Sequence, residues 1–314
     1  MSFSFWSMNK SNGAAAISVS GLNKSYGKFE VIRNLDLEIQ NNAIHGLVGL
    51  NGSGKTTTLE CILGLQPLNS GTISVLGQKP GMLHLTEGRV VAIFDTPSLH
   101  PNLTVRQCLQ HASLLCKQMV RTPIEVEQLL SIEQFQNFKI KNLSLGNKRR
   151  TSIAQALLGK PELIILDEPF SGLDAEGVND VLHLITRLNS EEGTTFLLSS
   201  HQLPYLEQIC SDIAILDKGS IAINGDVNSL LKTSGNQLML KTPSESLAIS
   251  VLDTIEGVEY SHTDDEGYLH VQIATTESAK LNQILVEKQI PVSEMILQRG
   301  SLGKLFREIT SEES

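Results

Sequence analysis

The chain has 314 residues, a formal net charge of −9 at pH 7 and 40% hydrophobic residues. This length favours one large and one small domain, with enough apolar residues for a sizeable core. The acidic balance argues against a nucleic-acid partner and against direct adhesion to an anionic membrane, since both require basic surfaces. No uninterrupted apolar run approaches the length that spans a bilayer.

The cysteines Cys61, Cys108, Cys116 and Cys210 show no C-x-x-C spacing. This favours a reduced intracellular protein with buried thiols. Residues 1–16 are polar and irregular and lack the apolar core of a secretion signal, so we expect a flexible leader. Together these features predict a cytoplasmic protein.

From residue 17 onward, short apolar runs alternate with helix-like periodicity. The predicted strands are Ile17–Leu22, Leu35–Ile39, Ala43–Val48, Gly71–Leu76, Val90–Phe94, Leu163–Leu166, Phe196–Ser199, Ile213–Leu216 and Ile221–Ile223. The predicted helices are Thr56–Leu65, Val105–Met119, Asn147–Leu158 and Gly177–Ser190. Runs that are apolar throughout suit a sheet covered on both faces. The pattern predicts an α/β domain over residues 17–233, with an antiparallel part near its start.

The polar stretch Thr233–Asn236 is typical of a linker. After it we expect strand Gln237–Lys241, helix Glu245–Ile255, strands Val258–Ser261 and Tyr268–Ile273, helix Glu277–Glu287, strand Val292–Ile296 and helix Leu302–Glu308. The order β-α-β-β-α-β is the split βαβ arrangement. Residues 237–314 are therefore predicted to form a small accessory α+β domain, whose role the sequence leaves open.

One segment matches the phosphate-loop pattern G-x-x-x-x-G-K-[ST]. It consists of Gly49, Leu50, Asn51, Gly52, Ser53, Gly54, Lys55 and Thr56, with Thr57 next in the chain. In such a loop the backbone N–H groups and a helix N-terminus face an anion, Lys55 reaches the β and γ phosphates, and the Thr56 hydroxyl binds Mg²⁺. The alternative is an ordinary glycine-rich turn, and the flanking strand and helix argue against it.

The apolar run Leu163–Leu166 ends in the carboxylates Asp167 and Glu168. Asp167 is placed to hold Mg²⁺, and Glu168 to orient the attacking water, as phosphoryl transfer requires. A strand ending in two acids is by itself usually a solvated strand end. Beside a phosphate loop, the pair predicts a nucleotide hydrolase.

Four further segments stand with these motifs in the order that is found in the ABC transporter ATPases, which the chain resembles over about residues 17–230. They are Tyr26 in Lys-Ser-Tyr-Gly, the signature-like Leu143-Ser144-Leu145-Gly146-Asn147, the segment Ser171-Gly172-Leu173-Asp174, and His201. Each has an ordinary structural interpretation, and their joint order favours the family. The resemblance implies a P-loop NTPase core of the ABC type with a helical subdomain at about residues 95–160. His45 gains no such support and is interpreted as structural.

By this resemblance, Tyr26 stacks on adenine, His201 contacts the γ-phosphate, and Asp174 belongs to a loop that communicates across a dimer. Ser144 and Gly146 of a second copy face the same phosphate, so ATP is expected between two copies. Leu145 and Asn147 depart from the LSGGQ consensus. The resemblance also implies a membrane permease on a separate chain, contacted through residues 95–104.

Asp95 occupies the position where the family usually carries a Gln that touches Mg²⁺ and the attacking water. The carboxylate is expected to ligate the metal, but it is shorter than Gln and charged. The acidic residue and the segment that follows it resemble those of the bacitracin and lantibiotic exporters, as does the C-terminal extension. This resemblance implies export of a peptide antibiotic.

Several alternatives remain open from the sequence. The permease would choose the cargo, so a drug, a lipid or an ion is also compatible. A non-transport ABC ATPase acting on the ribosome is less favoured, since one phosphate loop and an acidic balance are present. A nucleotide-sensing regulatory subunit is opposed by the intact Asp167, Glu168 and His201.

Overall fold

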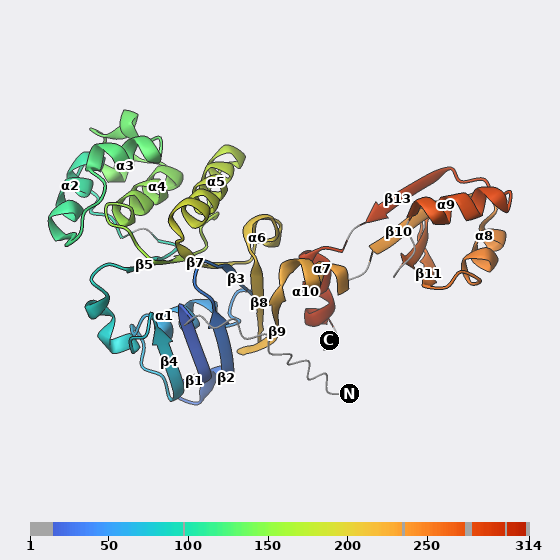
Figure 1. The fold of residues 1–314 in the computed structure, drawn as a ribbon, viewed down its shortest axis with the longest axis horizontal. Coiled ribbons are helices and arrows are strands. Elements are labelled where there is room, and N and C mark those ends of the chain that lie inside the picture. Colours follow the sequence, from blue (N-terminus) through green and yellow to red (C-terminus); the bar gives the residue numbers. More distant parts are fainter. Residues whose placement is uncertain (1–14, 97, 234–235, 274–277, 299, 312–314) are drawn as a thin grey trace. The chain divides into compact units, whose positions relative to one another are not determined.

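The computed structural model describes residues 15–96, 98–233, 236–273, 278–298 and 300–311. The predicted leader therefore lies outside the described residues except for its last two, as do residues 234 and 235 of the predicted linker. Contacts within the chain divide it into two compact units, residues 1–224 and 225–314 (Figure 1).

The smaller sheet of the first unit is antiparallel and has the order β2-β1-β4. Its strands are β1 (Ile17–Tyr26), β2 (Phe29–Ile39) and β4 (Ser70–Val75). Ile17 and Val19 of β1 are buried while Ser18 and Ser20 are exposed, which is the alternation of a sheet with one covered face. This is the antiparallel part predicted near the start of the domain.

The larger sheet has the order β5-β6-β7-β3-β8-β9. Its strands are β3 (Ile44–Val48), β5 (Val90–Ile93), β6 (Leu163–Asp167), β7 (Thr195–Ser200), β8 (Asp212–Asp217) and β9 (Ser220–Asp226). The pairs from β5 through β8 are parallel. The segments after β3, β6 and β7 therefore leave the sheet at one edge, beside one another.

Helices surround these sheets. They are α1 (Lys55–Ile62), α2 (Val105–Leu115), α3 (Pro123–Leu129), α4 (Leu145–Ala156), α5 (Ala175–Glu192) and α6 (Leu203–Ile209), with 3₁₀ turns at Pro80–Thr86, Glu133–Phe135 and Ile140–Asn142. Figure 1 shows α2, α3 and α4 grouped together, and they pack on one another. They lie within residues 95–160, the range of the predicted helical subdomain. Apolar residues of α1 and of both sheets share one core.

The second unit contains α7 (Val227–Thr233), β10 (Asn236–Lys241), α8 (Glu245–Leu252), β11 (Val258–Thr263), β12 (Leu269–Ile273), α9 (Ser278–Glu287), β13 (Glu294–Gln298) and α10 (Leu302–Ser311). Its antiparallel sheet has the order β11-β12-β10-β13, which confirms the predicted split βαβ arrangement. Leu252 of α8 and Leu281 of α9 share a core with Leu238 and Val271 of the sheet. Both helices therefore cover the same sheet face.

The structure differs from the expected elements in a few places. The predicted helix Val105–Met119 ends at Leu115, and the short helices α3 and α6 were not expected. A helix of seven residues gives too few apolar repeats to be recognised, although Thr122 and Glu125 form the capping box that opens α3. The boundary between the two units precedes α7, because α7 packs against α10 of the second unit. The predicted linker Thr233–Asn236 instead begins at the last residue of α7.

Candidate functional site

The loop between β3 and α1 has the backbone of an anion cradle. Gly52 and Gly54 have φ angles of 86° and 110°, in the region that favours glycine. A Cβ on Gly49 would lie 2.3 Å from Ser53 Oγ and 2.6 Å from the carbonyl oxygen of Leu216. Only glycine therefore fits where the chain leaves β3, while Leu50 and Asn51 are exposed.

The helix that follows offers free donors to an anion. No side chain in the described part of the chain caps the N-terminus of α1, and the first amides of a helix, here those of Lys55, Thr56 and Thr57, have no intrahelical partner. The buried hydroxyl of Ser53 also lacks a hydrogen-bond partner among the described residues. Buried polar atoms without partners are costly, so their presence here fits a loop that receives phosphate oxygens.

Lys55 crosses this loop and is only 7% exposed. Its Nζ donates to the carbonyl oxygens of Gly49 at 2.8 Å and Leu50 at 3.3 Å, and lies 3.9 Å from Glu168 Oε1. Burial lowers the pKa of Lys55, while the charges of Glu168 and Asp167 oppose that shift. The ammonium group is thus held inside the cradle, close to the end of β6.

Thr56 and Asp167 meet beside the loop although they lie far apart in the chain. The Thr56 hydroxyl donates to Asp167 Oδ2 at 3.2 Å. Ser199 at the end of β7 donates to the other carboxylate oxygen of Asp167. Hydroxyl and carboxylate oxygens are the ligands that Mg²⁺ prefers, so this pair fits a magnesium ion beside bound phosphates.

Glu168 contacts side chains at and just after the end of β7. Its Oε1 is 2.9 Å from His201 Nδ1, and its Oε2 accepts a hydrogen bond from the Ser200 hydroxyl at 3.1 Å. Its φ of 49° is unusual for a residue other than glycine. This strained backbone turns the carboxylate from the end of β6 towards the loop after β7.

The signature-like segment begins α4. Ser144 is the N-cap, and its hydroxyl accepts a hydrogen bond from the amide of Asn147 at 3.3 Å. Leu145 packs against Gly172, where a Cβ would lie 2.4 Å from Leu145 Cδ2, and a Cβ on Gly146 would be 3.0 Å from Leu173 Cδ2. Ser144, Gly146 and the segment before α5 therefore form a second cluster on the surface of the first unit.

Two predicted site residues, Asp174 and Tyr26, contact neighbours within the first unit. Asp174 caps α5, because its Oδ1 accepts a hydrogen bond from the amide of Gly177 at 2.9 Å. Tyr26 ends β1, is 46% exposed, and lies under the Lys24 ammonium, which is 4.8 Å from its ring centroid. An exposed ring at this position is available for stacking, and its adenine role stays a prediction.

Arg149 is the functional candidate that the sequence reasoning missed. It is 2% exposed and contacts both Asp95 and the backbone of Glu168. The available signal was its position four residues before the buried Ile153, which places a charge on the apolar side of the signature helix. Asp95 Oδ1 accepts a hydrogen bond from Arg149 Nη2 at 2.8 Å, which competes with the predicted role in metal binding.

The residues left outside the site have ordinary environments. His45 is buried in β3, and its Nε2 has no hydrogen-bond partner among the described residues. All four cysteines are free, and three of them are buried. Among the residues that the structure describes, none of the helices combines the length and apolarity needed to cross a bilayer.

A family profile and the known relatives of the chain point to the same protein family. The sequence profile of the ABC transporter family matches residues 32–171. The uncharacterized ABC transporter ATP-binding protein YdbJ of Bacillus subtilis (strain 168) is 30% identical over 295 residues, which cover 93% of this chain and 94% of the relative. The chain belongs to the ATP-binding proteins of ABC transporters. It is accordingly an ATP hydrolase of the ABC type.

Other members of the family extend this comparison. The bacitracin transport ATP-binding protein BcrA of Bacillus licheniformis is 29% identical over 92% of this chain and 95% of its own length. The methionine import ATP-binding protein MetN of Clostridioides difficile (strain 630) is 27% identical over 89% of this chain and 99% of its own length. A solved ATP-binding subunit of an ABC transporter superposes with a TM-score of 0.64 at 27% identity, covering 69% of this chain and 92% of that one. These likenesses confirm the predicted ABC ATPase fold.

Proposed function

We propose that this ABC ATPase binds ATP between two copies of itself and powers a separately encoded membrane permease. The observation that carries the proposal is the convergence of Lys55, Thr56, Asp167, Glu168 and His201 at one edge of the larger sheet. Lys55 supplies a cation for the phosphates, Thr56 and Asp167 supply oxygen ligands for Mg²⁺, and the Glu168 carboxylate lies beside them. Ser144 and Gly146 lie in a different cluster, which supports their acting on the nucleotide of a second copy.

Each residue has a distinct role in this proposal. Lys55 and the amides of the phosphate loop hold the phosphates, and Thr56 with Asp167 would hold Mg²⁺. Bound there, the ion would neutralise charge on the β and γ phosphates. Glu168 orients the attacking water, and the imidazole of His201, 2.9 Å away, holds its carboxylate and faces the γ-phosphate. Tyr26 supports the adenine ring.

A simple experiment tests the nucleotide assignment. Lys55→Ala removes the buried ammonium from the cradle, so we expect the affinity for MgATP to fall by at least about tenfold, the cost of one charge-assisted contact. Fluorescent-ATP titration of the purified full chain measures it. Tight MgATP binding by the variant would contradict the phosphate-loop assignment.

For cargo, we infer export of a peptide antibiotic of the bacitracin or lantibiotic type. Two observations support this inference, the name of the BcrA relative at 29% identity and the acidic residue Asp95 followed by T-P-S-L-H-P-N-L-T. Export of this kind would protect the cell that carries the transporter. The chain is expected at the inner face of the membrane through its permease.

Co-expression with the neighbouring permease in a sensitive host tests the cargo. We expect raised resistance to bacitracin or a lantibiotic with the parent chain and none with Glu168→Gln. A panel of peptide antibiotics with no change in resistance would contradict the inference and return attention to drugs, lipids or ions. The MetN relative makes uptake assays of small metabolites the appropriate comparison.

A further inference from the structure

A single buried guanidinium joins two loops to α4 at the catalytic edge of the larger sheet. Arg149 Nη1 donates to the carbonyl oxygen of Glu168 and to that of Ser171, the second at 2.8 Å. Its Nη2 donates to the carbonyl oxygen of Asp95 at 2.7 Å and to Asp95 Oδ1 at 2.8 Å. The signature helix is thereby tied to the segments after β5 and β6.

We call Arg149 together with its acceptors on Asp95, Glu168 and Ser171 the clamp. Its geometry is rigid. A guanidinium is planar and presents its donors in a fixed fork, so its acceptors are held in fixed relative positions. Arg149 is 2% exposed and its partner carboxylate on Asp95 is 54% exposed. Because a buried charge requires a counter-charge, the ion pair keeps Arg149 in place.

The clamp acts on the most strained part of the site. Glu168 has a φ of 49°, and a conformation of this kind persists only where surrounding contacts hold it. Its amide donates to the carbonyl oxygen of Ser199 at 2.9 Å, and its own carbonyl accepts from Arg149. The peptide groups on both sides of this residue are therefore held, which fixes the direction of its carboxylate.

We infer that Arg149 and Asp95 form one positioning unit for ATP hydrolysis. Arg149 holds the backbone of Glu168 in the conformation that points its carboxylate at His201, and Asp95 supplies the counter-charge that keeps Arg149 there. Asp95 thus acts through Arg149 and is not a ligand of Mg²⁺. The inference rests on the proposed role of Glu168.

Steady-state ATPase kinetics of the full chain test the unit, with Asp95→Asn, Arg149→Gln and the double variant. Each single change is expected to lower kcat between about tenfold and a hundredfold, the scale of a misplaced catalytic group, while the KM for ATP changes less than about twofold. Because the two residues act together, the kcat of the double variant should be no lower than that of the less active single variant. The Mg²⁺ concentration for half-maximal activity should not change in Asp95→Asn.

The opposite results would overturn the inference. A raised Mg²⁺ requirement in Asp95→Asn, with losses that multiply in the double variant, would make Asp95 a metal ligand. Unchanged kcat in Asp95→Asn would also contradict it. Asp95→Glu keeps the charge and should recover more activity than Asp95→Asn. If Arg149→Gln does not fold, the Mg²⁺ requirement of Asp95→Asn still separates the positioning role from metal binding.

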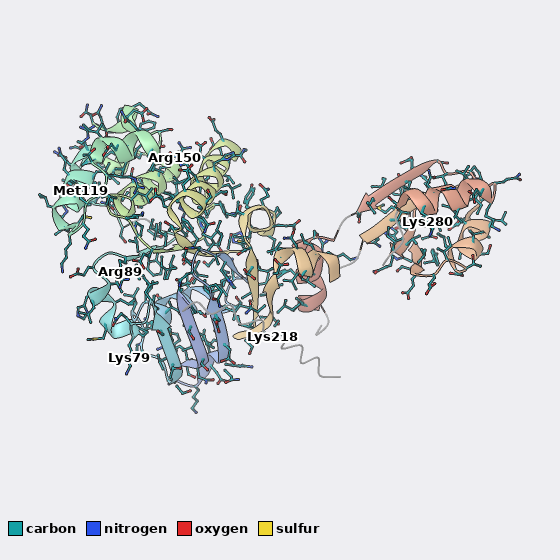
Figure 2. The ribbon with its side chains drawn as sticks, in the orientation of Figure 1. Lys79, Arg89, Met119, Arg150, Lys218 and Lys280 are labelled. Atoms are coloured by element: carbon teal, nitrogen blue, oxygen red, sulfur yellow. The ribbon has the colours of Figure 1, made fainter. Side chains whose placement is uncertain are left out.

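The same helix offers a matched control. Arg150, labelled in Figure 2, forms an ion pair with Asp180 at 2.7 Å, and Asp180 is 51% exposed. Asp180→Asn removes a neighbouring carboxylate partner without touching the catalytic segments, so kcat should be unchanged. Glu168→Gln tests the proposed role of Glu168 independently of Arg149 and Asp95. If it still turned over ATP at the parent rate, the proposed role of Glu168 would fail, whatever the clamp variants do.

Discussion

At the scale of single residues, the site is organised around carboxylates that are held by neighbours. Ser199 and Thr56 bind the carboxylate of Asp167, while Ser200 and His201 bind that of Glu168. Lys55 Nζ lies 3.9 Å from Glu168 Oε1, so the ammonium group and this carboxylate face each other beside the phosphate loop. A carboxylate fixed in this way needs little reorganisation when it orients a water molecule.

Glu168→Gln removes the charge and keeps the shape of the side chain. We expect kcat for ATP to fall at least about a hundredfold, the scale of general-base catalysis, while ATP binding is retained. Phosphate release and nucleotide binding measure the two properties. Glu162→Gln is a matched control near the other end of the same strand, since Glu162 is 53% exposed and pairs with Arg89. Equal turnover by both variants would refute the assignment.

His45 predicts a pH dependence of stability that is independent of catalysis. Burial lowers the pKa of His45 from 6.5 to about 4, with Asp212 opposing the shift. In the unfolded chain the His45 imidazole is protonated below pH 6.5, whereas in the folded chain it stays neutral down to about pH 4. The free energy of unfolding therefore falls as the pH decreases through this range. For this single group the loss between pH 7 and pH 5 amounts to about 2 kcal/mol.

His45→Leu should remove that part of the pH dependence. Urea unfolding of the first unit within the full chain, followed at pH 7 and pH 5, measures the free energy of unfolding for both proteins. We expect the parent to lose more stability than the variant between the two pH values. The same loss in both proteins would show that His45 is solvated or paired.

At the scale of elements, the signature turn and the segment before α5 fit together closely. Gly172 has a φ of 70°, and a Cβ there would lie 2.4 Å from Leu145 Cδ2. Leu145, which departs from the LSGGQ consensus, is the side chain that fills this space. The start of α4 and the segment before α5 therefore pack against each other as one surface.

Gly172→Ala should shift that surface and lower kcat by about tenfold, because a misplacement near 1 Å is costly in a preorganised site. It should also cost about 1 kcal/mol of stability through the left-handed backbone. Gly88→Ala is the control, since Gly88 has a φ of 89° but no described residue has an atom within 4 Å of its Cβ position. Both variants should lose stability, measured by thermal unfolding, and only Gly172→Ala should lose turnover. Normal turnover in Gly172→Ala would mean that the contact is unimportant.

At the scale of the whole molecule, the proposed dimer joins one cluster of the first unit to a different cluster of a second copy. One cluster contains the phosphate loop, Asp167 and Glu168. The other contains Ser144 and Gly146. A nucleotide that contacts both would stabilise the closed dimer over open monomers, because a ligand favours the state that it binds better.

We expect Glu168→Gln to form a dimer when MgATP is added and to remain monomeric without it. Light scattering coupled to size-exclusion chromatography, with the permease present in a parallel sample, gives the mass. Adding Ser144→Arg to this variant places a bulky cation at the proposed interface between the two copies. It should abolish the dimer while leaving ATP binding intact. A protein that stays monomeric in both samples would overturn the two-copy proposal.

The sequence alone determined the features that lie within one contiguous stretch. The phosphate loop, the acidic end of β6 and the alternation of strands and helices are local patterns, since glycine conformations and apolar periodicity act over a few residues. The tertiary structure decided the pairings between distant segments. Thr56 meets Asp167 across 111 positions, and Arg149 meets Asp95 across 54. Such contacts depend on how the strands are ordered in the sheet and on which charges become buried together, and no local pattern encodes either.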